Sequence, residues 1–309
     1  MDRKTLDSTA EYVPSRTDAE APAPRSPSAS VQVEIAASSH PGKVRPNNED
    51  HYLVARAGRF LRIAMTNLPE GRVPDEFEDL VHAMAVADGM GGMAAGEVAS
   101  QLALAVLVNL VLDTPDWIFG LEEPHVEAIL NRAVRRFQDV NRVLVEQARR
   151  NPKLAGMGTT LTLAWSFGAE LFVAHVGDSR VYLLRQGKLR RLTRDHTRAE
   201  ELAEMGLIAP QDVATHRLRH VLTQALGIWE SGGDAEVDRI RLADGDRLLV
   251  CTDGLTDMVD DATIAAELES SRNLTAGSAC QALLDLALER GGKDNVTIIV
   301  AGYRFVEGT

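Results

Sequence analysis

The sequence predicts an α+β fold in which antiparallel or mixed β-sheets are covered by helices. Segments rich in aliphatic and β-branched residues cluster in blocks, and long helical segments separate these blocks instead of alternating strictly with single strands. Gly, Asp or Asn bounds most of the apolar segments, as is typical of strands. The chain has 309 residues and a hydrophobic fraction of 45%, which is enough for a sizeable core.

Nine segments have the composition of β-strands, because aliphatic and β-branched residues dominate them. They are Val31–Ala36, His51–Ala55, Ala83–Ala87, Thr159–Trp165, Leu171–Val176, Val181–Leu184, Ala235–Leu242, Arg247–Cys251 and Val296–Tyr303. The sequence QGK at 186–188 separates VYLLR from LRRLT and predicts a hairpin.

Four longer segments predict helices, namely Glu97–Val111, Glu122–Arg150, Thr263–Glu269 and Leu274–Arg290. The second has apolar residues at helical spacing, with Pro124 in its first turn. Asp260 and Asp261 can cap the start of the third. Gly291 and Gly292 give the fourth a strong stop signal.

Three stretches differ from this pattern. Residues 1–30 are rich in Ser, Pro and Ala and predict a disordered tail, because they cannot bury enough apolar surface to offset their ordering entropy. Residues 67–80 are turn-rich and acidic, which predicts a surface insertion. Residues 195–227 predict a small mobile appendage with one short helix.

The bulk composition narrows the functional class. The net charge of −12 argues against a nucleic-acid binder, which needs a basic face. Two cysteines are too few for a disulfide framework or a CxxC zinc site. No apolar run approaches the length that spans a bilayer, and no signal-peptide core is visible, so we expect a cytoplasmic protein without a membrane partner.

The most informative pattern is a series of Asp residues at the ends of apolar strands. Asp88 follows HAMAVA and opens DGMGG, Asp253 follows RLLVCT, and Asp294 precedes VTIIV. Such strands bring carboxylates to one edge of a sheet, and carboxylates without matching Arg or Lys indicate hard divalent cations. Each motif alone could be a plain tight turn, but three from distant regions argue against coincidence.

Two further motifs carry charged residues of the same kind. In RPNNED, Arg45 offers a planar fork for a phosphate, whereas Glu49 and Asp50 point to opposite faces of a strand. Only one of these carboxylates needs to touch a metal directly, and a solvated acidic turn is the simpler interpretation of this motif alone. In GDSR, Asp178 either joins the metal site or caps the turn and pairs with Arg180.

Taken in order, these motifs resemble those of the PPM/PP2C family of metal-dependent protein serine/threonine phosphatases, in its bacterial branch. The resemblance rests on RPNNED, DGMGG with GE at 96–97, MGTTLT, AHVGDSRVYLLR, LTRDHT, CTDGLTD and GGKDNVT, and it spans about residues 31–304. It implies a β-sandwich of two mostly antiparallel sheets flanked by helices, within a phosphatase domain over 31–305. Residues 195–227 match the family's flap, which lies beside the active site and shapes substrate choice.

The resemblance also implies two Mg²⁺ or Mn²⁺ ions. Asp88 would bridge them, and the Gly89 carbonyl would complete one of them. Asp253 and Asp294 would bind the first ion. Asp88 and Asp253 are therefore expected to be catalytic.

Further roles follow from the same resemblance. Glu49 and Asp50 would hold the second ion, at least partly through water. Arg45 would bind the substrate phosphate as a catalytic residue. Asp178, together with Asp253, would form a third and weaker metal site.

One departure from the family concerns the general acid. Animal members carry a His just after the DG pair, where this chain has Met90, and some bacterial members have a His where this chain has Met93. Methionine cannot transfer a proton. Leaving-group protonation must therefore come from metal-bound water or from a residue that the sequence does not identify.

The histidines offer few candidates for that role. His216 and His220 are spaced i, i+4, but they have Arg neighbours and no HExxH glutamate, so packing at the surface or in the flap is the better interpretation. His175 is expected to sit in a sheet. His196 could approach the cleft, but the sequence does not identify it as a proton donor.

The sequence thus predicts a phosphatase for phosphoserine and phosphothreonine in proteins, in which two metals activate water without a covalent phospho-enzyme. The partners expected are phosphoproteins and a Ser/Thr kinase, and the chain is expected to be a monomer. One alternative is a binding-only pseudophosphatase, which should lack one of Asp88, Asp253 and Asp294. Another is a regulator that dephosphorylates a small anti-sigma antagonist. A nucleotide-binding module is disfavoured, since P-loop and GxGxxG motifs are missing.

Overall fold

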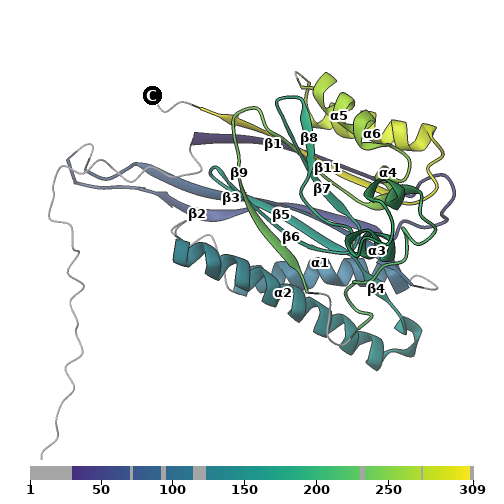
Figure 1. The fold of residues 1–309 in the computed structure, drawn as a ribbon. Helices are drawn as coiled ribbons and strands as arrows, with labels where there is room; N and C mark the ends of the chain where they lie inside the picture. Colours follow the sequence, from purple (N-terminus) through teal and green to yellow (C-terminus); the bar gives the residue numbers. More distant parts are fainter. Residues whose placement is uncertain are drawn as a thin grey trace, which may run out of the picture.

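Two antiparallel β-sheets lie face to face between two pairs of helices (Figure 1). The computed structural model describes residues 30–69, 72–91, 95–113, 123–229, 234–272 and 274–306. This architecture confirms the predicted sandwich of two antiparallel sheets flanked by helices. The predicted tail at residues 1–30 lies outside the described residues, except for residue 30.

The first sheet has the strand order β1-β11-β10-β7-β8. These strands are β1 (Val31–His40), β11 (Val296–Phe305), β10 (Arg247–Cys251), β7 (Arg180–Arg185) and β8 (Lys188–Arg191), and all neighbours are antiparallel. The predicted hairpin joins β7 to β8, with both Gln186 and Gly187 at positive φ. The outer face of this first sheet is covered by α5 (Asp261–Ser270) and α6 (Ala276–Glu289).

The second sheet has the order β2-β3-β5-β6-β9, and the short strand β4 pairs with the end of β3. The strands are β2 (Asp50–Arg62), β3 (Glu76–Met90), β4 (Gly158–Thr159), β5 (Leu161–Phe167), β6 (Glu170–Val176) and β9 (Glu236–Arg241). Two long helices, α1 (Ala95–Asp113) and α2 (Glu123–Arg150), cover its outer face. The 3₁₀ helix η3 (Pro152–Leu154) follows α2.

The layers enclose three apolar cores, one between the sheets and one under each helix pair. Strand β10 shows why its sequence reads as an unbroken apolar run. Leu248 and Val250 point into the core between the sheets, whereas Leu249 and Cys251 point towards α5 and α6. Since both faces of the strand are buried, no polar alternation is needed.

The predicted insertion at 67–80 is partly wrong, because β3 already begins at Glu76 and pairs with β2 along its length. Ion pairs between facing residues explain how such a polar segment forms a strand. Arg62 pairs with Glu76, and Arg59 pairs with Asp79, with 2.6 Å between the charged atoms in each case. Cross-strand pairs of opposite charge stabilise antiparallel strands.

Helix α1 corrects the expectation that no apolar run has membrane-spanning length. By length and composition alone it qualifies as a span, with a hydropathy of 1.7 in its most apolar window. In this fold its small residues Ala95, Ala99 and Ala103 are buried in the core that α1 shares with β3 and α2. These small residues thus serve close packing of a helix on a sheet.

The predicted appendage at 195–227 contains α3 (Arg198–Glu204), as expected, and also a 3₁₀ helix η4 (Pro210–Thr215). We call residues 195–227 the flap. Thr197 caps α3 and forms a bridge with Leu222, while Leu226 pairs with Thr159 at β4. The flap is therefore attached to the sheet near the ends of the strands that carry Asp88 and Asp178.

Candidate metal centre

A cavity of about 630 Å³ lies at one end of the sandwich and collects most of the predicted site residues. Its lining includes six acidic residues, Glu49, Asp88, Asp178, Asp253, Asp257 and Asp294. Gly89 and Arg45 also line it. Asp50 does not, because it is buried directly behind this wall.

Strand pairing brings Asp50 and Asp88 together, since they face each other at the ends of β2 and β3. The Thr252 hydroxyl donates to Asp50 Oδ2 at 2.7 Å, whereas Asp50 Oδ1 has no hydrogen-bond partner among the residues that the structure describes. The Asp88 backbone is fixed by Thr160, which donates its N–H to the Asp88 carbonyl and accepts from the Asp88 N–H. Both carboxylates are thus positioned by the sheets.

Position 89, near the end of β3, needs glycine for a steric reason. A Cβ on Gly89 would lie 2.1 Å from the carbonyl oxygen of Gly96, at the start of α1. The Gly89 N–H donates to the Glu49 carbonyl at 3.2 Å. The close approach of two backbones leaves this wall of the cavity without side-chain bulk.

Asp253 begins the short helix α4 (Asp253–Thr256) directly after β10. A Cβ on Gly254 would lie only 1.9 Å from the Asn295 carbonyl oxygen, so CTDG and GGKDN pack backbone against backbone. Asp294 lies just before β11 and faces the same cavity. These contacts explain how two distant segments place their carboxylates side by side.

Sequence reasoning missed the residue that ties these loops together, Asn295. Its side chain accepts from the Glu49 N–H at 2.8 Å and donates to the carbonyls of Pro41 and Asn47. The available signal in the sequence was a polar residue, Asn295, directly before the apolar strand segment VTIIV. Asn295 therefore positions the RPNNED segment relative to Asp294.

Arg45 reaches the cavity as predicted, but it is engaged with a predicted metal ligand. Its Nη2 donates to Asp294 Oδ2 at 2.6 Å, and this hydrogen bond and the charge of Asp294 raise the pKa of Arg45. Arg219 and Lys293 also line the cavity. The sequence expectation of carboxylates without basic neighbours is therefore wrong in part.

Asp178 follows β6, where Gly177 has a φ of 119°. Burial, and the charge of Asp195, raise the pKa of Asp178 to about 7. The short ion pair of Arg180 is formed with Asp195 and not with Asp178, at 2.6 Å between Arg180 Nη2 and Asp195 Oδ2. The alternative in which Arg180 merely pairs with Asp178 is thus wrong, and Asp178 faces the cavity.

The buried carboxylates oppose one another's ionisation. Burial raises the pKa of Asp50 to about 7, and burial together with the charges of Asp50, Asp253 and Asp178 raises the pKa of Asp88 well above its usual range. Asp253 is partly exposed to the cavity, yet its Oδ1 is buried and meets no hydrogen-bond partner in the described part of the chain. Clustered carboxylates with orphaned oxygens are a donor set that fits divalent cations.

Four of the eight histidines bear on the site, and they fall into two pairs. His175 and His196 are buried, and their imidazoles lie 5.0 Å apart between ring centres, outside the lining of the cavity. His216 and His220 do not share a helix, contrary to what their spacing allowed. Only His220 of this second pair lines the cavity, together with Met90. Met93 lies outside the described residues.

Comparison with known proteins adds independent information on this arrangement. A family model described as protein phosphatase 2C matches residues 75–288. The chain is 40% identical to the serine/threonine protein phosphatase PstP of Mycobacterium tuberculosis over 252 residues, and the matched region covers 80% of this chain and 46% of PstP. It is 36% identical over 261 residues to the serine/threonine phosphatase stp of Listeria innocua, covering 84% and 91% of the two chains. The chain thus spans about half the length of PstP.

Solved structures agree with these matches. The crystal structure of the M. tuberculosis phosphatase PstP/Ppp superposes with a TM-score of 0.70 at 35% identity, covering 89% of this chain and 99% of that one. The catalytic domain of PstP in complex with two manganese ions gives a TM-score of 0.68 at 34% identity, with the same coverage.

Proposed function

The chain belongs to the protein phosphatase 2C family, and we propose on this basis that it hydrolyses phosphoserine and phosphothreonine in proteins with the help of two divalent cations. The observation that carries the proposal is the cavity in which Asp88, Asp253 and Asp294 meet, because each comes from a different part of the chain. A pseudophosphatase would be expected to lack one of these three.

The donor set fits Mg²⁺ or Mn²⁺, which prefer oxygen ligands. Asp88 with Asp253 and Asp294 would hold one ion, and the Gly89 carbonyl would complete one of the two ions. Asp88 with Glu49 and Asp50 would hold the other ion, at least partly through water, because Asp50 is buried behind the cavity wall. Bound ions would supply a water of lowered pKa and positive charge beside the phosphoryl oxygens. The two manganese ions in the complex of the PstP catalytic domain support the proposal of two divalent cations.

The chain's own residues would orient the substrate. Arg45, on the rim of the cavity, offers two parallel N–H groups to phosphoryl oxygens. Thr252 holds Asp50, and Asn295 holds the segment that carries Glu49, so the carboxylates are fixed before substrate arrives. Met90 cannot donate a proton to the leaving group.

The biological setting follows as part of the same proposal. The substrates would be phosphoproteins made by a Ser/Thr kinase, and the protein would act as a cytoplasmic monomer. Its catalytic unit would span residues 31–305, with the flap shaping substrate choice. Residues 1–30 would be a tail outside this unit.

The proposal is tested by hydrolysis of a phosphoserine and phosphothreonine peptide panel with Mn²⁺ and with chelator. We expect turnover only with metal, and its loss in Asp253→Asn while the variant stays folded. Asp285→Asn makes the same chemical change on the exposed face of α6 and should retain wild-type activity. Full activity of Asp253→Asn would overturn the proposal.

A further inference from the structure

We propose that His220 of the flap forms a metal site together with Asp253 and Asp257, in which the imidazole supplies a nitrogen ligand. The inference rests on the proposed function only in that the cavity takes up divalent cations. It differs from the third site implied by the sequence resemblance, which joined Asp178 to Asp253.

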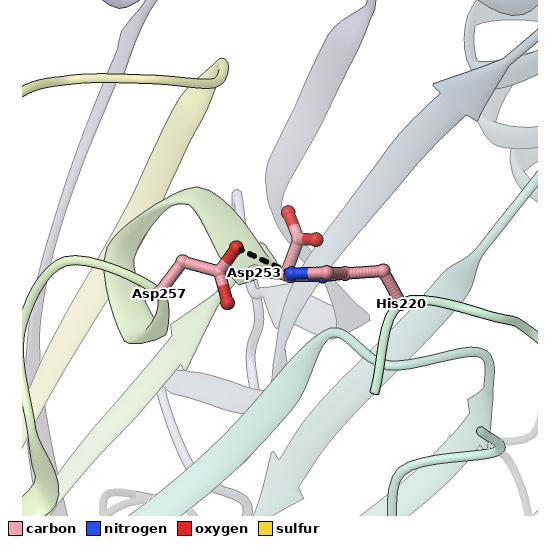
Figure 2. A group of neighbouring side chains, drawn as sticks. All are labelled: His220, Asp253 and Asp257. Atoms are coloured by element: carbon pink, nitrogen blue, oxygen red, sulfur yellow. Dashed lines mark ion pairs between the residues drawn. The ribbon is translucent and has the colours of Figure 1, made fainter. Parts of the chain in front are cut away.

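The geometry places three potential ligand atoms around one point. One ligand atom from each of His220, Asp253 and Asp257 lies within 4.8 Å of the other two. His220 Nε2 is 3.6 Å from Asp257 Oδ2, and Figure 2 shows the imidazole beside both carboxylates. Ligand atoms that share an ion at about 2.1 Å each must lie within roughly 4.2 Å of one another. Small side-chain rotations would therefore close the site.

Asp253 begins the short helix α4, and Asp257 is the residue that caps its C-terminal end. The Asp257 N–H donates to the Asp253 carbonyl at 2.8 Å, as residues four apart in a helix do. Residues at this spacing share one face of a helix, so both carboxylates point to the flap. Asp257 is thus placed by α4 and not by the flap itself.

The flap holds His220 opposite this face through backbone hydrogen bonds. The Arg198 N–H donates to the Val221 carbonyl at 2.8 Å, and the Thr223 N–H donates to the His196 carbonyl at the same distance. These bonds lie on either side of Leu222, close behind His220. The imidazole is therefore presented by ordered backbone in contact with the start of α3.

The buried Oδ1 of Asp253, already noted for the main centre, also fits a cation beside this carboxylate. It has no hydrogen-bond partner within the described part of the chain. A buried carboxylate oxygen without a partner carries a desolvation cost that a cation would offset. His220 and Asp257 do not form a hydrogen bond with each other either, because 3.6 Å between Nε2 and Oδ2 is too long.

A nitrogen ligand has a consequence for metal choice. Imidazole suits Zn²⁺ and other first-row transition metals, among which Mn²⁺ binds it most weakly, whereas Mg²⁺ keeps to oxygen ligands. Because His220 lies on the flap and the carboxylates lie on α4, an ion shared by them would also fix the flap against the body of the enzyme. Metal identity and flap position would thus be linked at this site.

The test reads the metal directly on the full-length protein loaded with Mn²⁺. Pulsed electron paramagnetic resonance should show ¹⁴N coupling to Mn²⁺ in the wild type. The coupling should vanish in His220→Ala and persist in His216→Ala, the matched flap control. Equilibrium dialysis should show at least about tenfold weaker binding of one Mn²⁺ in His220→Ala, with a smaller change for Mg²⁺.

The outcomes separate this inference from the proposed function. Wild-type protein that binds Mn²⁺ and hydrolyses phosphopeptides without ¹⁴N coupling would overturn the His220 site and leave the phosphatase in place. Coupling that persists in His220→Ala would assign the nitrogen to another residue and also overturn it. Metal-dependent coupling in a protein without phosphatase activity would support the metal site and count against the proposed function.

Discussion

Arg45 and Asp294 form an ion pair on the rim of the cavity, with 2.6 Å between Nη2 and Oδ2. The family resemblance implied separate tasks for these residues, one for phosphate and one for metal. In the folded chain they share a hydrogen bond across 249 positions of sequence. The pair holds the guanidinium over the cavity, where a phosphoryl group would have to compete with Asp294 for it.

Replacing Arg45 should therefore affect substrate use more than stability. We expect Arg45→Ala to lower kcat/KM for a phosphothreonine peptide by about 10- to 100-fold, since a charge-assisted hydrogen bond to phosphate is lost. Arg45→Lys should recover only part of this, because Lys lacks the planar fork. Steady-state kinetics measure the effect. The melting temperature should hardly change, because an exposed ion pair contributes little.

Asp178→Ala should reduce phosphatase activity while the two-metal centre around Asp88 is retained. Asp178 faces the cavity without Arg180 as a partner, so its removal leaves the Arg180–Asp195 pair intact. Metal titration and peptide hydrolysis on the same sample check this. Loss of both tightly bound ions would show that Asp178 belongs to the main centre instead.

Gly254→Ala should destabilise the fold by about 1–3 kcal/mol and impair the metal centre. The added Cβ would meet the Asn295 carbonyl oxygen at 1.9 Å, and backbone must move to relieve such overpacking. Gly302→Ala is the control, because apart from its chain neighbours no atom of the described residues lies within 4 Å of its added Cβ. Urea unfolding of both variants measures the difference. Equal stabilities would contradict the packing argument.

His175 should make the folded state sensitive to acid. Its Nε2 faces the carbonyls of Gly177 and Arg194, which only accept, while Nδ1 faces the Thr162 hydroxyl, so the neutral ring satisfies both nitrogens. Burial, and the charge of His196, lower the pKa of His175 to about 3 from 6.5.

Below about pH 6.5, His175 therefore binds a proton in the unfolded chain, whereas in the folded chain it stays neutral until the pH approaches 3. The stability that His175 contributes is complete above pH 6.5 and falls by about 1.4 kcal/mol per pH unit as the pH drops towards 3. Urea unfolding between pH 7 and pH 5 should give a shallower dependence for His175→Gln than for wild type. Parallel curves would show that His175 is not the group responsible.

Removal of residues 1–29 should leave hydrolysis of phosphopeptides unchanged. The carbonyl of Ser30, the first described residue, accepts from the Val306 N–H at 2.9 Å. The pairing of β1 with β11 therefore extends to Ser30 without residues 1–29. The kcat and KM of the truncated and full-length proteins provide the comparison. A large loss would assign the tail a part in catalysis.

The sequence alone determined the fold class, most of the strands and helices, and the acidic residues that the cavity collects. It could do so because strand composition, helix caps and Asp–Gly turns are local signals. Thr263, for instance, donates its N–H to the side chain of Asp260 at 2.9 Å, as the capping pattern predicted.

Only the tertiary structure decided which charges meet. The Arg45–Asp294 pair, the Arg180–Asp195 pair and the position of His220 beside α4 join segments that no local pattern connects. The same holds for the strand from Glu76, which forms because its acidic residues meet arginines on β2. A charged side chain interacts with whatever lies within a few ångströms, and that neighbourhood is set by the packing of sheets and flap, not by sequence spacing.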